Sequence, residues 1–134
     1  MKKITVKAQV DSLADVMNFV NDELELYNFP RKAQNDINLA VDEIFANIAR
    51  YAYDHDGGTA EVFISVDEKA IVRFEDSGKP YNPLEQDAPD LDIPIEEREL
   101  GGLGIHLVKD AMDTIEYEYT DGKNILILSK GRGA

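Results

Sequence analysis

Two residues with the clearest chemical potential, Glu43 and Asn47, lie in a segment with helical periodicity. Because they are four positions apart, both side chains project from one face of a helix. A carboxylate there can orient or deprotonate a nucleophile, while a neighbouring carboxamide oxygen can coordinate a hard cation such as Mg²⁺. Phosphoryl transfer needs such positioning and charge neutralisation more than covalent chemistry. Taken alone, such a pair is more commonly the polar edge of an ordinary helix.

A second candidate is Asp76-Ser77-Gly78, an acidic turn at the end of a strand pattern. A fixed carboxylate at a strand end can accept a hydrogen bond from the amine of a nucleobase. An ordinary turn after a strand is the alternative interpretation of the same three residues.

A glycine cluster, Gly101-Gly102-Leu103-Gly104, runs directly into another helical pattern. Glycines at a helix start let backbone N–H groups approach an anion, and the helix dipole favours negative charge there. The cluster is not a Walker A loop, because no Gly-Lys-Ser/Thr follows, and no βαβ unit of the Rossmann kind surrounds it. Together with Asp76 it indicates a nucleotide held at both ends. A loop-to-helix hinge is the alternative.

Hydrophobic periodicity predicts the elements that must position these residues. Ser12 is expected to cap a first helix, with Asp15 in a capping-box position. Two more helices are predicted over residues 30–53 and 102–112, and strands over 4–10, 60–66, 70–75, 115–120 and 125–129. Because consecutive hairpins dominate, we predict an α+β fold: a two-layer sandwich of a mixed, mostly antiparallel sheet with helices on one face.

Residues 83–100 interrupt this pattern of helices and strands. They contain Pro83, Pro89 and Pro94 and a high density of acidic residues, namely Glu85, Asp87, Asp90, Asp92, Glu96, Glu97 and Glu99. Long loops inside compact domains are usually functional lids or disordered segments. Since this loop joins the Asp76 turn to the glycine cluster, we expect a lid over about residues 83–100.

Length and composition exclude several classes of function. The 134 residues are expected to form a single domain over positions 1–134. A net charge of −13 argues against binding nucleic acid or an anionic membrane surface. With no cysteine and only two isolated histidines, a zinc site is not expected. The lack of a membrane-length apolar run and of a signal-peptide pattern favours a cytoplasmic protein.

Taken in chain order, the motifs resemble those of the GHKL superfamily of ATPases and kinases. Residues 42–53 resemble its N-box, residues 76–83 its first glycine box, and residues 101–108 with 122–124 its second box and closing hairpin. The resemblance extends from about residue 5 to residue 130. It is greatest to stand-alone anti-sigma-factor serine/threonine kinases of the RsbW and SpoIIAB type.

The resemblance implies a Bergerat-type ATP-binding fold and a role for each motif. Glu43 would be the general base acting on a serine hydroxyl, and Asn47 would coordinate Mg²⁺ between the phosphates. Asp76 would accept the adenine amino group, while Gly78 would let the base approach the backbone. The phosphates would be bound by the residues of the glycine cluster, Gly101, Gly102, Leu103 and Gly104.

The expected function is therefore that of an ATP-dependent kinase in bacterial partner switching. Its substrate would be a small anti-sigma-factor antagonist of the STAS type. The resemblance also implies that the protein binds a sigma factor as a second partner and forms a homodimer. An ATP-binding regulatory domain without kinase activity is the alternative, and a plain interaction domain is a third.

Three features depart from the family pattern. Tyr51 stands where a His is common after the N-box. Lys123 and Asn124 follow Gly122 in the last hairpin, where many relatives carry a Thr just after the Gly, near the adenine, and an Asn would replace that Thr only in part. The lid, finally, is unusually acidic, so that Mg²⁺ or a basic partner must offset its charge beside a triphosphate, or the lid must stay open.

Overall fold

The computed structural model of the chain describes residues 1–54, 57–85 and 102–133. The α-helices in these ranges are α1 (Leu13–Leu26), α2 (Arg31–Tyr51) and α3 (Gly102–Ala111). The strands are β1 (Lys2–Lys7), β2 (Thr59–Val66), β3 (Lys69–Asp76), β4 (Thr114–Thr120) and β5 (Lys123–Gly131). Short 3₁₀ turns cover Val10–Ser12 and Pro83–Glu85.

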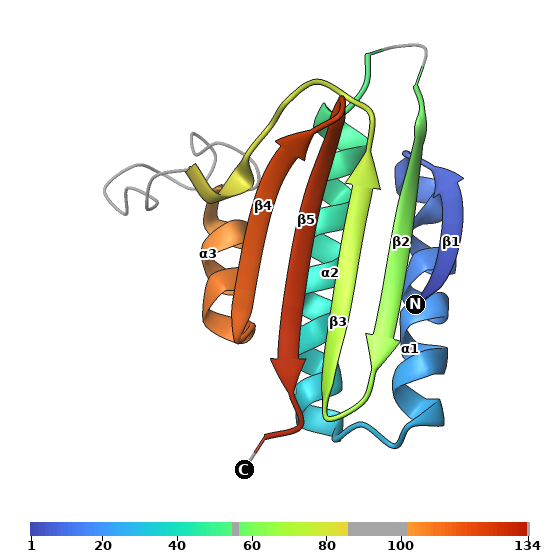
Figure 1. The fold of residues 1–134 in the computed structure, drawn as a ribbon, viewed down its shortest axis with the longest axis vertical. Helices are drawn as coiled ribbons and strands as arrows, with labels where there is room; N and C mark the ends of the chain where they lie inside the picture. The colour runs from blue at the N-terminus through green and yellow to red at the C-terminus, as the bar shows by residue number, and fades with distance from the viewer. Residues whose placement is uncertain (55–56, 86–101, 134) are drawn as a thin grey trace.

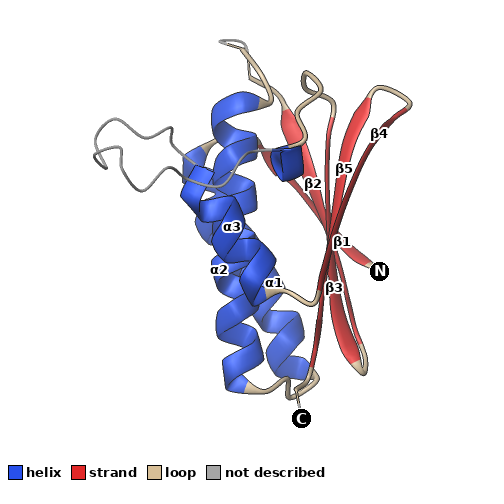
Figure 2. Cartoon of the chain, turned by 90° about the vertical axis from the view of Figure 1, so that its left-hand side faces the viewer, coloured by secondary structure: helices blue, strands red, loops and turns tan. Residues whose placement is uncertain are grey.

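The strands form one five-stranded sheet in the order β1-β2-β3-β5-β4 (Figure 1). Each ladder between neighbouring described strands is antiparallel. The helices lie together on one face of this sheet, and the other face carries no helix among the described residues (Figure 2). The predicted α+β class and two-layer arrangement are confirmed.

Helix α2 packs lengthwise along the sheet because its apolar residues recur at helical spacing (Figure 1). The buried apolar positions on this stripe are Ala33, Ile37, Ala40, Val41, Ile44 and Phe45. Alternate residues of β2 and β3 are buried in the same core, namely Val62, Ile64, Val72 and Phe74. The same packing buries Asn47, a polar residue of α2.

The structure differs most from the sequence expectation in the segment before α1. Strand β1 ends at Lys7, because Val10–Ser12 already turns into a 3₁₀ helix before α1. Ser12 does precede α1, but its buried side chain makes no capping hydrogen bond, so the predicted capping box does not form.

The last hairpin aligns two polar residues that matter for the site. Asp121 and Gly122 both have positive φ, 54° and 76°, as a two-residue turn of type I′ requires. This turn sets the register of β5, which in turn pairs with β3 so that Asn124 lies directly opposite Asp76. Two residues far apart in the sequence therefore become neighbours at one end of the sheet.

No helix in the described part of the chain is long and apolar enough to cross a membrane.

The packing of α2 can be tested with a matched pair of substitutions. Ile37 is fully buried in the core, whereas Leu39 on the same helix is 43% exposed. We expect Ile37→Ala to lower the free energy of unfolding by about 2–5 kcal/mol, because it removes buried methyl groups and leaves a cavity. Leu39→Ala should change it by roughly 0.5 kcal/mol or less. Urea denaturation measures both, and equal losses would contradict the assignment of the buried face.

Candidate functional site

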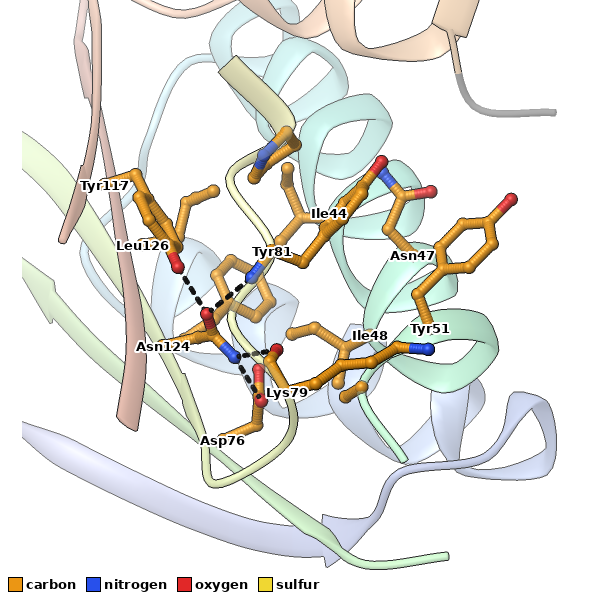
Figure 3. Close-up of a pocket in the computed structure, with 13 residues that line it drawn as sticks. Ile44, Asn47, Ile48, Tyr51, Asp76, Lys79, Tyr81, Tyr117, Asn124 and Leu126 are labelled. Carbon is orange, nitrogen blue, oxygen red and sulfur yellow. Dashed lines mark hydrogen bonds between the residues drawn. The ribbon is translucent and has the colours of Figure 1, made fainter. Parts of the chain in front are cut away.

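A cavity that is partly open to solvent lies between α2 and the end of the sheet where β3 stops (Figure 3). Its apolar lining is formed by Ile44, Ile48, Phe74 and Leu126. Its polar lining includes residues from α2, β3, β4, β5 and the loop after β3, namely Asn47, Tyr51, Asp76, Lys79, Tyr81, Tyr117 and Asn124. An apolar slot with a few fixed polar groups is the usual form of a site for a planar organic ligand.

Asn47 is the most unusual polar residue of this cavity. It is only 5% exposed, yet neither its side-chain oxygen nor its side-chain nitrogen has a hydrogen-bond partner among the described residues. Nearly all buried polar groups in native proteins are hydrogen-bonded, and leaving one unpaired costs about 1–3 kcal/mol. A carboxamide held in this way is suited to bind a ligand that replaces the lost contacts.

Glu43 lies one turn before Asn47 and, like Asn47, has a buried polar atom without a hydrogen-bond partner among the described residues. Its side chain is half-buried, and its Oε1 atom is buried without a hydrogen-bond partner in the described part of the chain. Burial raises the pKa of the Glu43 carboxyl above its ordinary value of 4.5; Arg50 opposes this shift and Asp42 adds to it. A carboxylate with a raised pKa is a stronger base than an ordinary one.

The first turn of α3 lies directly against Glu43. A Cβ atom added to Gly104 would be 2.1 Å from both Cδ and Oε1 of Glu43, which is far inside van der Waals contact. Only glycine fits at this position without moving the carboxylate. The structure thus brings the N-box helix and the glycine cluster together, although the sequence separates them.

The glycine cluster can be described only in part. Helix α3 begins at Gly102, so the cluster does run into a helix as the sequence predicts. Leu103 follows in the first turn, near Gly104. Gly101 and residues 86–100, which make up most of the predicted lid, lie outside the described residues.

Asp76 is buried at the end of β3, only 7% exposed. Its Oδ1 accepts hydrogen bonds from the backbone N–H of Gly78 at 2.9 Å and from Nδ2 of Asn124 at 3.0 Å. Gly78 is required by close packing, because a Cβ there would be 2.0 Å from the carbonyl oxygen of Ala52. The adjacent Lys79 N–H donates to that same carbonyl at 2.9 Å, which ties the loop to the end of α2.

Asn124 is the residue whose importance sequence reasoning underestimated. It was identified only as a departure from the family pattern, yet it contacts both Asp76 and the loop that follows (Figure 3). The only signal in the sequence is the position of the last turn, since that turn determines which residue of β5 faces Asp76.

The donor set fits Mg²⁺ better than a metal held by protein ligands alone. No group of three or more His, Asp or Glu residues suited to a metal ion occurs within the described ranges. Mg²⁺ in nucleotide sites usually takes one or two protein oxygens and completes its shell with phosphates and waters. The buried side-chain oxygen of Asn47, which has no partner among the described residues, is an oxygen of the kind that such a shell takes from a protein.

Comparison with known proteins agrees with this geometry. Residues 6–130 match the family described as the histidine kinase-like ATPase domain. The chain belongs to this family, which confirms the resemblance to GHKL proteins.

Among individual proteins, the chain is similar to the serine-protein kinase RsbW of Bacillus cereus, with 27% identity over 127 residues. That alignment covers 91% of this chain and 73% of the relative. The serine-protein kinase RsbW of Bacillus mycoides is 25% identical over the same length, with the same coverage of both chains.

Two solved structures share the fold. One contains the RsbU and RsbW domains of Rv1364c from Mycobacterium tuberculosis, with a TM-score of 0.64 and 12% identity. The match covers 98% of this chain but only 32% of that one. The other is the Acinetobacter baumannii histidine kinase AdeS, with a TM-score of 0.54, 16% identity, and coverage of 100% of this chain and 70% of that one.

The raised pKa of Glu43 predicts a specific dependence of stability on pH. The pKa of this carboxyl is higher in the folded protein than its ordinary value of 4.5. Its ionisation therefore lowers the free energy of unfolding as the pH rises above 4.5. Glu43→Gln removes the ionisation. We therefore expect the variant to gain stability relative to wild type as the pH rises above about 4.5, the ordinary value from which the pKa of Glu43 is raised.

Urea denaturation across that range measures this gain. Glu25→Gln, on an exposed part of α1, is the control for loss of one negative charge from an acidic protein. The gain should be larger for Glu43→Gln than for Glu25→Gln. Identical pH profiles for the two variants would mean that burial does not act on the Glu43 carboxyl.

Proposed function

We propose that the protein binds ATP together with Mg²⁺ and transfers the γ-phosphoryl group to a serine of a small anti-sigma-factor antagonist. The observation that carries this proposal is the buried amide of Asn47, one turn from the buried Oε1 of Glu43, both without a hydrogen-bond partner in the part of the chain that the structure describes. The glycine start of α3 lies against the same carboxylate. The relatives named serine-protein kinase RsbW support the choice of a serine as acceptor.

The adenine is proposed to enter the cavity, with its exocyclic amine donating to the carboxylate of Asp76. Gly78 is proposed to let the base approach the backbone of this loop, which packs against the carbonyl of Ala52. The apolar side chains of Ile44 and Leu126, both part of the cavity lining, would contact the ring system. Backbone N–H groups of the glycine cluster are proposed to donate to the phosphates, and these belong to Gly101, Gly102, Leu103 and Gly104.

Bound Mg²⁺ would neutralise the phosphate charge, with the side-chain oxygen of Asn47 as its protein ligand. Glu43 is proposed to accept the proton of the serine hydroxyl through Oε1. The serine oxygen forms a bond to the γ-phosphorus, the bond from that phosphorus to the β–γ bridging oxygen breaks, and ADP leaves. Burial raises the pKa of Glu43 towards the pH at which it works, which suits a general base.

The proposed partners follow from the resemblance and from the charge of the chain. The substrate is proposed to be an antagonist of the STAS type, a sigma factor is proposed as a second partner, and the working form is proposed to be a homodimer. With a net charge of −13, the chain favours a partner with a basic contact surface. The reaction is proposed to take place in the cytoplasm.

A phosphotransfer assay tests this function. The purified protein is mixed with Mg²⁺-ATP and with candidate antagonist proteins of the STAS type from the same organism, and phosphoserine is measured by mass spectrometry. Glu43→Gln should reduce the transfer rate by about 100-fold or more, since general bases contribute about 10²–10⁴-fold. The variant should still be stabilised by ATP, by about 2.7 kcal/mol at 100 times the dissociation constant.

Glu25→Gln is again the matched control and should transfer phosphate like wild type. Unchanged transfer by Glu43→Gln would contradict the role of Glu43. A wild-type protein that is stabilised by Mg²⁺-ATP but transfers nothing would be a nucleotide-binding regulator instead. No stabilisation by Mg²⁺-ATP would overturn the nucleotide site itself.

A further inference from the structure

We propose that Asn124, supported by Tyr117, is a positioning residue that sets the base specificity of the site by fixing the carboxylate of Asp76. This inference rests on the proposed binding of ATP. Asn124 and Asp76 face each other across the β3–β5 ladder, and each is only 7% exposed. The contacts around them determine which atoms remain available to a ligand.

The carboxamide of Asn124 has used its whole hydrogen-bonding capacity. Its Nδ2 donates to Oδ1 of Asp76 at 3.0 Å and to the carbonyl oxygen of Lys79 at 2.9 Å. Its Oδ1 accepts from the backbone N–H of Tyr81 at 3.1 Å and from the hydroxyl of Tyr117. A carboxamide offers two donors and two acceptor lone pairs. Asn124 therefore has nothing left for a nucleobase and acts through the groups that it holds.

The hydrogen bonds from Asn124 and Gly78 distinguish the two carboxylate oxygens of Asp76, because both go to Oδ1. Oδ1 accepts from Asn124 and from the Gly78 N–H, at 3.0 and 2.9 Å. Among the described residues, the donors to this carboxylate converge on Oδ1, which leaves Oδ2 to accept from a ligand. With Oδ1 fixed by two donors, the carboxylate cannot rotate to turn a different edge to the cavity.

A carboxylate oxygen fixed in this way can accept from an exocyclic amine but cannot donate to a carbonyl. It thus favours a 6-amino purine over a 6-oxo purine. Figure 3 shows how the arrangement is held together: Asn124 joins the end of β3, the Lys79–Tyr81 loop and Tyr117 of β4 around one side of the cavity. The hydroxyl of Tyr117 keeps the carboxamide in the orientation that presents Nδ2 to Asp76.

A double-mutant cycle with two nucleotides tests this inference. The dissociation constants of ATP and of ITP, which has a 6-oxo group, are measured with Mg²⁺ for wild type, Asn124→Ala, Asp76→Ala and the double variant. Asn124→Ala should reduce the preference for ATP over ITP on the order of tenfold, because a hydrogen bond to a charged group is weakened. In the Asp76→Ala background it should cause no further change.

Tyr117→Phe should change the ATP preference in the same direction by a smaller factor, and it carries the test if Asn124→Ala fails to fold. Tyr119→Phe, two residues along β4 and 46% exposed, is the matched control and should leave the preference unchanged.

Two outcomes would overturn the inference alone. Equal losses for ATP and ITP would mean that Asn124 only maintains the shape of the pocket, and an unchanged loss in the Asp76→Ala background would mean that it does not act through Asp76. If the wild-type protein bound neither nucleotide, the proposed function would fail and this inference with it.

Discussion

The structure depends on the packing of one long amphipathic helix, α2, on an antiparallel sheet. This packing buries the apolar stripe around Ile37, Val41 and Ile44. It also carries Asn47, on the neighbouring strip of the same helix, into an environment that shields it from solvent. The hydrophobic contacts stabilise the helix strongly enough to hold an unpaired polar group beside them. The packing of the core therefore offsets the free energy that it costs to bury the amide of Asn47 without hydrogen bonds.

Close backbone approach is the second constraint on the site. Gly78 lies so close to the backbone carbonyl of Ala52 that no Cβ fits there, and Gly104 lies so close to Glu43 that a Cβ would displace the carboxylate. These two contacts bring the loop after β3 and the start of α3 onto the C-terminal half of α2 and the residue that follows it. A helix that presents Glu43 and Asn47 thus meets both glycine motifs, and the three sequence motifs become one site.

Much of this arrangement could be predicted from the sequence, because it depends on local patterns. The i, i+4 spacing placed Glu43 and Asn47 on one helical face, and alternation identified the hairpins that make the sheet antiparallel. The contact between Gly104 and Glu43 could not be predicted, since it depends on how α3 packs on α2. The hydrogen bonds around Asn124 could not be predicted either, because they depend on strand register. The Asp121–Gly122 turn sets this register, and it lies far from Asp76 in the sequence. The capping box at Ser12 does not form because the 3₁₀ turn Val10–Ser12 runs directly into α1, so Ser12 has helical dihedral angles and not the extended ones typical of an N-cap.

The central claim is that Asn47, which is buried and has no hydrogen-bond partner among the described residues, binds a ligand through its amide. The most direct test is the free energy of unfolding of Asn47→Leu, measured by urea denaturation with and without saturating Mg²⁺-ATP. Leucine is similar in shape and has no polar atom to leave unpaired. Without nucleotide the variant should be more stable than wild type by about 1 kcal/mol, and Mg²⁺-ATP should no longer stabilise it. A variant that is less stable without nucleotide, yet stabilised by Mg²⁺-ATP as much as wild type, would contradict the account.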